Sequence, residues 1–580
     1  MLNDIKKIFT QLDKKIVNKI YLIFALMVFI IGLEVFGISL VIPFLNSITE
    51  PDYLIRKKEL LNLPQNLSFL NVLFEQKIFL ILLIVFYLFK NFLQGFLIFL
   101  KTKFIFSIQK KLSSNLFKIY LYKNFFFHLN NNSALLIRNV TDEVGAFVQN
   151  FLVSVLDLFL EIFVFIAIFF LLFYIEPFGA SFIALTFLIV GFSFYNTFKK
   201  KIQFLGQERQ YHDGEKLKRL FQSFQAIKEV KILNIEKELI NQFNFNNFKS
   251  LDIGSKRFFL LQVPKLIFEV FAIFSLIFLV FINLEVKNNT ALIPIIGAFT
   301  AAAFRMVPSI NRIISSLQNI KFSYPSIKII RNEICNENLK DKNIDKDLYK
   351  KVYFDKFELK NISFKYSYDQ PEILKNVNLT IKRGDKIGII GKSGAGKTTL
   401  VDIILGLLDQ SRGVKLLNNG ELNDESKDWQ NLIAYVPQDV FLLDDTLKSN
   451  VAFGVKEEKI DNEKLLLSLS KAQLKNLVQN RKDGINTCLG EGGLKISGGQ
   501  RQRVGIARAL YSDPDVIIFD EATSSLDHMT EAKILDEIEL NLKEKTIIMI
   551  THRENSLKFF DKIYEIKDSM LITKKNFVNE

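Results

Sequence analysis

Cysteine is scarce in this sequence, since only Cys335 and Cys488 occur among 580 residues. Neither lies at a metal-ligand spacing, so we expect neither a disulfide framework nor a zinc site. A cleavable signal peptide is also not expected. The first apolar run, from Ile20 to about Ile48, is too long for one and lacks a small-residue cleavage site. This run instead predicts a helix that spans a membrane.

Acidic residues are outnumbered, because 61 Asp and Glu residues stand against 75 Lys and Arg residues, which gives a net charge of +14. A basic balance can indicate nucleic-acid binding. The long apolar runs favour a membrane protein instead, in which lysine-rich cytoplasmic loops meet anionic lipid headgroups. We therefore expect membrane lipids as partners and no nucleic acid.

Hydrophobic residues make up 49% of the chain and include 58 phenylalanines, while 23% of the residues are charged. A chain of this length is too long for one ordinary soluble domain. Together these values predict a polytopic helical membrane domain joined to a soluble domain. Six apolar runs approach or exceed the roughly 20 residues that cross a bilayer. They lie near residues 20–46, 77–100, 147–175, 178–198, 258–283 and 291–317.

Lysines are concentrated at the N-terminus and in residues 101–146 and 199–257. The positive-inside rule makes these regions cytoplasmic, so both termini are expected inside. The two long inner loops have helical periodicity and predict helices that extend beyond the membrane, turning back near Phe125–Ser133 and Phe221–Leu233. We expect these turns to dock on the soluble domain, because unstructured loops of this length are uncommon; ordinary solvated loops are the alternative.

The outer segment, residues 47–76, is longer than a simple turn. Within it, Tyr53–Leu63 has amphipathic spacing, which predicts a short helix on the membrane surface, with a solvated loop as the alternative.

The soluble part follows a polar stretch that is rich in Lys, Asp, Glu and Asn. We predict a membrane domain over residues 1–332, a linker over 333–351 and the soluble domain over 352–580. In the soluble domain, short β-like runs alternate with helices, as in an α/β nucleotide-binding domain.

A glycine-rich loop follows an apolar strand predicted at 386–390 and opens a helix predicted at 399–407. It consists of Gly391, Lys392, Ser393, Gly394, Ala395, Gly396, Lys397 and Thr398, which match the phosphate-loop pattern in full. The glycines let backbone N–H groups wrap phosphates at the positive end of a helix dipole. We expect this loop and Thr399 to bind ATP, with Lys397 at the β- and γ-phosphates and Thr398 at Mg²⁺.

Two carboxylates follow a predicted buried strand, the four apolar residues 516–519. Asp520 is expected to hold Mg²⁺, directly or through water. Glu521 lies one residue later, where it would polarise the attacking water as a general base.

A Ser-Gly-Gly-Gln segment comprises Ser497, Gly498, Gly499 and Gln500. With the two preceding motifs, it makes the chain resemble the ATP-binding-cassette (ABC) superfamily. The signature of that family is usually LSGGQ, so Ile496 is a conservative departure. The resemblance implies that this segment of one subunit caps the ATP held by another, in keeping with an anion-binding helix N-terminus. It therefore implies a dimer, most simply a homodimer, in which ATP hydrolysis drives transport.

Further motifs fall in the order of the family. The resemblance implies that Tyr366 stacks on adenine, with Tyr368 as a rival and a strand-end surface tyrosine as the alternative. It implies that Gln438 touches Mg²⁺ and links the site to the membrane loops. Residues 490–492 resemble the loop that precedes the signature in exporters.

Two more motifs lie close to the ATP site in the family. Asp527 matches the loop that crosses the dimer interface, and His552 matches the switch histidine that contacts the γ-phosphate. The resemblance thus implies four catalytic residues, which are Lys397, Gln438, Glu521 and His552.

Charged residues within the apolar runs are costly to bury and are commonly functional. The cations are Lys90, Lys265, Arg305 and Arg312, and the acids are Glu34, Asp157, Glu161 and Glu269. One interpretation is a set of structural ion pairs, since Glu269 follows Lys265 by four residues. The other is a basic lining for an anionic cargo such as a diphosphate headgroup, with Arg305 and Arg312 on one helix face.

A closer resemblance favours the second interpretation. Residues 34–45, 263–265 and 304–313 look similar to bacterial lipid-linked oligosaccharide flippases of the Pgl protein-glycosylation type. That resemblance implies an inner-membrane protein that moves a polyprenyl-diphosphate-linked glycan outward. It also implies that the four cations hold the diphosphate, although Lys90 and Lys265 lack the bidentate fork of arginine.

Other functions are weighed against this one. The chain could export drugs, other lipids or peptides with the same motor. A soluble ABC ATPase of DNA repair or translation conflicts with six spanning runs. An ATP-gated channel is disfavoured because a hydrolysing motor needs both Glu521 and His552, and both are present.

Overall fold

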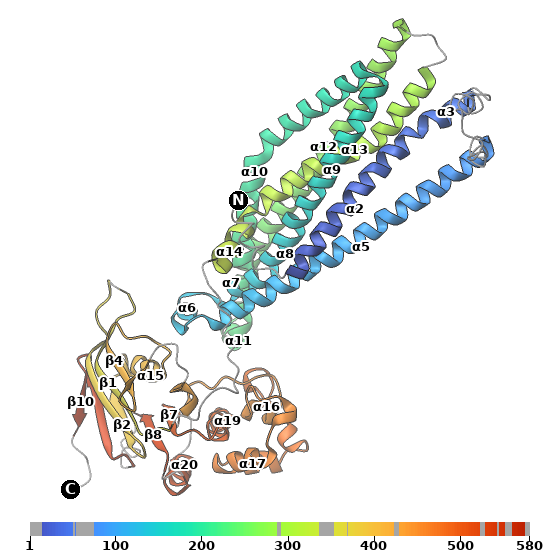
Figure 1. The fold of residues 1–580 in the computed structure, drawn as a ribbon. Coiled ribbons are helices and arrows are strands. Elements are labelled where there is room, and N and C mark those ends of the chain that lie inside the picture. The colour runs from blue at the N-terminus through green and yellow to red at the C-terminus, as the bar shows by residue number, and fades with distance from the viewer. Residues whose placement is uncertain are drawn as a thin grey trace. The chain divides into compact units, whose positions relative to one another are not determined.

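The structure is a computed structural model that describes residues 14–49, 53, 75–286, 292–335, 353–367, 369–422, 428–522, 528–541, 544–551 and 559–574. The chain divides into two compact units (Figure 1). The helical unit comprises Met1–Lys123 and His128–Asp341, and the α/β unit comprises Asn124–Phe127 and Lys342–Glu580. Most of the expected linker and of the outer segment 47–76 lies outside the described residues.

The helical unit is built from long helices that run side by side (Figure 1). In chain order these are α2 (Lys14–Ser39), α3 (Val41–Thr49), α5 (Gln76–Tyr122), α9 (Val153–Ile175), α10 (Pro177–Gln225), α12 (Glu236–Val286) and α13 (Leu292–Phe322). Within the described residues, six spans are long and apolar enough to cross a membrane. This confirms the expected polytopic helical membrane domain.

Three of these helices are much longer than a bilayer requires. α5 has 47 residues, α10 has 49 and α12 has 51. At 1.5 Å per residue each extends about 70 Å or more, against a hydrocarbon core of about 30 Å. The chain turns back through α6 (Phe125–Asn130) and through α11 (Ile227–Leu233), near the expected turns. Docking of these turns on the soluble domain stays a prediction.

The packing of the helical unit leaves many large apolar side chains facing outward. Its core includes Phe165, Phe187, Phe268 and Phe299 from α9, α10, α12 and α13, each at most 8% exposed. Many other phenylalanines are more than half exposed, among them Phe92 at 72% and Phe192 at 73%. An apolar surface of this kind is stable in lipid and not in water.

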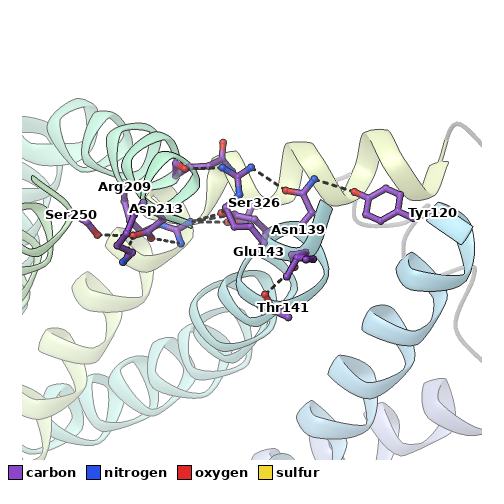
Figure 2. A network of polar contacts seen from close by, with 12 residues as sticks. Tyr120, Asn139, Thr141, Glu143, Arg209, Asp213, Ser250 and Ser326 are labelled. Carbon is purple, nitrogen blue, oxygen red and sulfur yellow. Dashed lines mark hydrogen bonds and ion pairs between the residues drawn. The ribbon is translucent and has the colours of Figure 1, made fainter. Parts of the chain in front are cut away.

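A buried carboxylate joins four segments near the ends of the long helices (Figure 2). Glu143, which is 0% exposed, closes the π-helical turn η2 (Asn139–Glu143) after α7 (Ser133–Arg138). Its carboxylate accepts hydrogen bonds from Arg209 of α10 at 3.2 and 3.3 Å and from Ser326 of α14 (Tyr324–Cys335). Arg138 lies 3.9 Å from the same group.

A second branch of this network reaches α5. Arg138 donates to the carbonyl of Gln210 at 2.9 Å and to the side chain of Asn139 at 3.0 Å. The Asn139 amide in turn donates to the Tyr120 hydroxyl at 3.0 Å. A Cβ atom at Gly214 would lie 2.4 Å from the Arg138 guanidinium, so only glycine leaves room for this arrangement.

The α/β unit contains two sheets. A four-stranded antiparallel sheet has the order β2–β1–β4–β5, with β2 (Leu374–Lys382), β1 (Lys356–Phe364), β4 (Arg412–Leu417) and β5 (Gly420–Glu421). A six-stranded sheet has the order β10–β9–β3–β8–β7–β6. Its strands are β10 (Met570–Lys574), β9 (Lys562–Lys567), β3 (Lys386–Gly391), β8 (Thr546–Ile550), β7 (Val516–Asp520) and β6 (Ile433–Val436).

In the six-stranded sheet, β9, β3, β8, β7 and β6 are parallel. β7 and β8 are buried at every position, as their uninterrupted apolar sequences require. The carboxyl ends of parallel strands meet at one edge, where ligands of such sheets bind. This confirms the expected α/β class and identifies the edge at which the motifs meet.

Removal of the Glu143 carboxylate should destabilise the helical unit. Glu143→Ala leaves Arg138 and Arg209 buried without that counter-charge, which typically costs about 3–5 kcal/mol. We expect a clearly lower midpoint of thermal unfolding for the full chain in detergent. Glu236→Ala, which removes an exposed pair with Lys231, is the matched control and should change the midpoint little. Equal midpoints for the two variants would contradict the structural role of Glu143.

Candidate functional site

The phosphate loop connects β3 to helix α15 (Lys397–Ile404). Gly394 and Gly396 have φ angles of 78° and 102°, a region that favours glycine. A Cβ at Gly396 would lie 3.0 Å from the side chain of Ile373. Residues 392–394 and Thr398 are exposed, so the loop presents its backbone outward at the start of a helix.

Lys397 is buried at 8% exposure beneath this loop. Its ammonium group donates to the carbonyls of Gly391 at 2.9 Å and Lys392 at 3.1 Å. Both partners are neutral, so the positive charge remains available to an anion held in the loop.

Asp520 ends β7 beside β8 and β6. Burial is the main cause that raises the pKa of its carboxyl, and the negative charge of Glu521 adds to this effect. The hydroxyl of Tyr435 on β6 donates to Asp520 at 3.2 Å and acts in the opposite direction, as does the charge of Lys397. A buried carboxylate in these surroundings would be stabilised by a nearby cation.

Glu521 lies just beyond the strand, with an unusual backbone conformation. Its φ angle is 48°, which a non-glycine residue adopts at an energetic cost and mainly at functional sites. Its N–H donates to the carbonyl of Ile550 at 3.1 Å, which fixes it beside the end of β8. Its carboxylate accepts a hydrogen bond from the Gln438 amide at 3.2 Å. The structure therefore brings two of the four expected catalytic residues together.

Tyr366 is partly buried, and its hydroxyl lies 3.2 Å from the Thr399 hydroxyl. Tyr366 therefore borders the helix that follows the phosphate loop. Stacking on adenine stays a prediction, and Tyr368 lies outside the described residues.

The Ser-Gly-Gly-Gln segment begins helix α19 (Gly498–Tyr511). Ser497 is its N-cap, and Ser497 and Gln500 form a reciprocal capping box with hydrogen bonds of 3.0 and 3.2 Å. The hydrogen bonds found for these four residues in the described chain stay within residues 493–503. The segment thus forms a separate helix N-terminus and not a second wall of its own phosphate loop.

Two expected ATP ligands, Asp527 and His552, lie outside the described residues. Thr551, the residue before His552, is described. Its N–H donates to the carbonyl of Ile389 on β3 at 3.3 Å. The chain therefore leaves β8 beside the strand that leads into the phosphate loop.

The structure adds residues that the motifs did not identify. Tyr435 contacts Asp520, and Gln502 of α19 donates to the carbonyl of Pro437 at 3.1 Å, next to Gln438. Asp402 of α15 is partly buried, and this burial and then the charge of Asp520 raise its pKa to about 6. Strand pairing and helix packing bring these residues to the site, so no local sequence pattern could have predicted them.

In the helical unit, the charged residues of the apolar runs are paired. Lys90 contacts Glu34 at 3.2 Å, and Arg305 contacts Glu34 at 3.2 Å and Glu161 at 3.5 Å. Arg312 contacts Glu161 at 2.5 Å. Both carboxylates are at most 6% exposed at the side chain, so three cations surround two buried acids.

The remaining charges are also paired, one pair within a helical turn and one between two helices. Lys265 lies 3.8 Å from Glu269, the pair that the sequence spacing suggested. Lys101, just beyond the second apolar run, pairs with Asp157. Each charged residue of the apolar runs named above therefore has a partner of opposite charge in the described chain.

A cavity of about 580 Å³ lies between α12 and α13 next to this network. Arg312, Lys265, Glu269 and Asn311 contribute polar groups, and the rest of its lining is largely apolar. The side chains of Arg312 and Lys265 are 52% and 56% exposed, whereas those of Lys90 and Arg305 are 11% and 18% exposed. Only two of the four expected cargo residues therefore line this cavity.

The raised pKa of Asp402 predicts a pH-dependent stability. Between the ordinary aspartate value of 3.8 and about 6, the folded carboxyl holds a proton that the unfolded one releases. The free energy of unfolding therefore falls as the pH rises through this range. Without Mg²⁺ or nucleotide, Asp402→Asn should unfold at a higher temperature than the unchanged chain at pH 7.5, and the difference should shrink at pH 5. The exposed Asp483→Asn is the control, and a difference independent of pH would contradict this assignment.

Comparisons with known proteins agree with this geometry. The ABC transporter family model matches residues 374–524. The ATP-dependent lipid A-core flippase of Ralstonia nicotianae is 36% identical over 214 residues, which are 37% of this chain and 36% of that protein. A putative export ATP-binding/permease protein of Rickettsia typhi is 38% identical over 218 residues, which are 37% of this chain and 38% of that protein. The matches thus span little more than a third of these relatives.

A solved structure extends the likeness to the membrane helices. A bacterial Atm1-family ABC exporter with ATP bound has a TM-score of 0.76 at 18% identity, over 96% of this chain and 95% of that one. At this identity the likeness concerns the fold alone. Residues 374–524 are therefore similar to the ABC transporter family, and the chain shares the fold of this solved exporter.

Proposed function

We propose that two copies of this chain form an ATP-driven exporter in a bacterial inner membrane, with both termini of each chain in the cytoplasm. The main support for the proposal is that one polypeptide contains both six membrane spans and an ABC ATPase domain. A chain of this kind has the parts of a transporter: a motor and a membrane passage.

In the proposed site, the loop 391–398 and Thr399 bind the phosphates of ATP, and Tyr366 stacks on its adenine. The buried Lys397, whose hydrogen bonds go to neutral carbonyls, neutralises phosphate charge. The strained backbone of Glu521 holds its carboxylate against Gln438, where it orients a water and takes its proton. His552 contacts the γ-phosphate.

Mg²⁺ would be held by Thr398, Gln438 and Asp520. The residues fit such an ion, because Asp520 is a buried carboxyl with a raised pKa beside other acids. When bound, the ion would offset negative charge on the phosphates. The water itself would be positioned by Glu521 and Gln438, whose side chains are hydrogen-bonded to each other.

The second half of each site would come from the partner chain. Ser497, Gly498, Gly499 and Gln500 form an isolated helix N-terminus with N–H groups suited to an anion. With Asp527, this segment would close over ATP held by the other chain. Closure and reopening of the two domains would reorient the membrane helices.

For the cargo, we propose an amphipathic anionic lipid, specifically a polyprenyl-diphosphate-linked oligosaccharide, moved from the inner to the outer leaflet. The half-exposed Arg312 and Lys265 in the 580 Å³ cavity support this proposal, since an apolar pocket with few cations suits a lipid with an anionic head. Lys90 and Arg305 would act indirectly. Their two positive charges neutralise the carboxylates of Glu34 and Glu161, so the positive charge of Arg312 would not be cancelled. A relative named as a flippase of a lipid also fits. Export of drugs, other lipids or peptides is the alternative.

Glu521→Gln tests the general base. The amide cannot accept the proton of water, so we expect ATP hydrolysis to fall at least about 100-fold while ATP binding persists. The measurement is phosphate release and nucleotide binding by the full chain in liposomes. Glu544→Gln, an exposed change in the same domain, is the control. An unchanged rate of ATP hydrolysis in Glu521→Gln would contradict the assignment of Glu521 as the general base.

Arg312→Gln tests the cargo site. It removes a cavity cation, so transfer of a fluorescent diphosphate-linked glycan lipid between leaflets should slow about tenfold or more while basal ATP hydrolysis continues. Lys328→Gln, an exposed change on α14, should leave transfer unchanged. Transfer at the original rate in Arg312→Gln would contradict an anionic cargo at this cavity. Failure of the unchanged chain to move the glycan lipid would contradict the cargo class.

A further inference from the structure

A second cavity, of about 420 Å³, lies in the helical unit among α10, α12 and α13. Its polar lining comprises Arg209, Asp213, Ser250 and Arg257, and its apolar lining includes Phe258 and Phe322. It is distinct from the cargo cavity, because Arg312 and Phe322 are ten residues, or about 15 Å, apart along α13.

Arg257, which is partly buried, differs from the other cations of the helical unit described above, because each of those contacts a carboxylate. Its guanidinium donates to the amide oxygens of Asn150 at 2.7 Å and Asn319 at 2.9 Å, and it lies 4.0 Å from the centre of the Phe322 ring. Its Nε atom is buried without a hydrogen bond. No carboxylate of the described chain lies within 4 Å of it. The site therefore holds a fixed positive charge with neutral partners only.

Arg209 provides the contrast within the same cavity. It contacts Glu143 at 3.2 Å and Asp213 at 3.7 Å, so two carboxylates balance it. Asp213 is also bound by Lys216 at 3.2 Å and by the Ser250 hydroxyl at 2.6 Å. The local acids are thus already engaged, and the charge of Arg257 is left for a ligand. A buried charge without a counter-ion is costly, which favours an external anion at this position.

The position of Arg257 along α12 indicates the source of that anion. It directly precedes the apolar run 258–283, at the end that the positive-inside rule makes cytoplasmic. Phe258 and Phe259 are 66% and 67% exposed, as expected of side chains that face lipid. Headgroup phosphates lie just outside the hydrocarbon core, and basic pockets between membrane helices on this side bind anionic headgroups.

We propose that Arg257 binds the phosphate of an anionic phospholipid of the inner leaflet. The planar guanidinium suits a phosphate oxyanion, and the cavity volume is within the range of small-ligand sites, about 300–1,000 Å³. The acyl chains of this phospholipid would extend from the cavity past the exposed Phe258 into the bilayer. The proposal depends on the membrane placement of the helices and not on the identity of the cargo.

Lipid binding to the full chain tests this site. The nucleotide-free protein in detergent is titrated with phosphatidylglycerol or, in a separate experiment, with phosphatidylcholine, whose headgroup carries its own cation. Native mass spectrometry then counts the bound lipid molecules. We expect Arg257→Gln to weaken phosphatidylglycerol binding about tenfold, as loss of a charged hydrogen-bond donor predicts. Arg257→Lys, which retains the charge, should bind more tightly than Arg257→Gln.

The adjacent Lys256 supplies a matched control. It is 55% exposed at the side chain and pairs with Asp252 at 2.5 Å, so Lys256→Gln should bind phosphatidylglycerol like the unchanged chain. Equal binding by Arg257→Gln and the unchanged chain would overturn the proposal, as would equal weakening by Lys256→Gln. Arg257-dependent binding of inorganic phosphate without any binding of phosphatidylglycerol would overturn the assignment to a lipid.

Discussion

A charge removed from water needs an opposite charge or a ligand, and this constraint organises both units of the protein. In the helical unit, Glu143 holds Arg209 and Arg138 together, while Glu34 and Glu161 hold the cations of the apolar runs. These contacts fix which helix faces meet, because the alternative is an unpaired ion in a medium of low dielectric constant. The ion pairs therefore stabilise the fold and are not only features of a ligand site.

The exceptions to this pairing coincide with the proposed ligand sites. Within the described residues, Lys397 donates to carbonyls alone, and Arg257 contacts amides and an aromatic ring alone. Asp520 is the reverse case, a buried acid whose pKa is raised mainly by its burial. Each group is held rigidly by strands or helices before its ligand arrives, which reduces the entropy lost on binding.

Much of the fold and of the ATP site could be predicted because their signals are local. Six apolar runs predict six spans, and eight consecutive residues specify the phosphate loop. The pair Lys265–Glu269 follows from one helical turn. Contacts between distant residues could not be predicted, because they depend on strand order and helix faces. Arg305 and Glu34 are 271 positions apart, and Tyr435 and Asp520 are 85 apart.

Complementation between two defective chains tests most directly whether each ATP site is shared by two chains. Lys397→Ala and Ser497→Ala chains carrying different tags would be combined, and the mixed dimer isolated and assayed for ATP hydrolysis. In a head-to-tail dimer, one of its two sites has both Lys397 and Ser497 intact, so hydrolysis should exceed that of either parent homodimer. Hydrolysis no greater than that of the two parents would show that the site is completed within one chain, and would contradict this account.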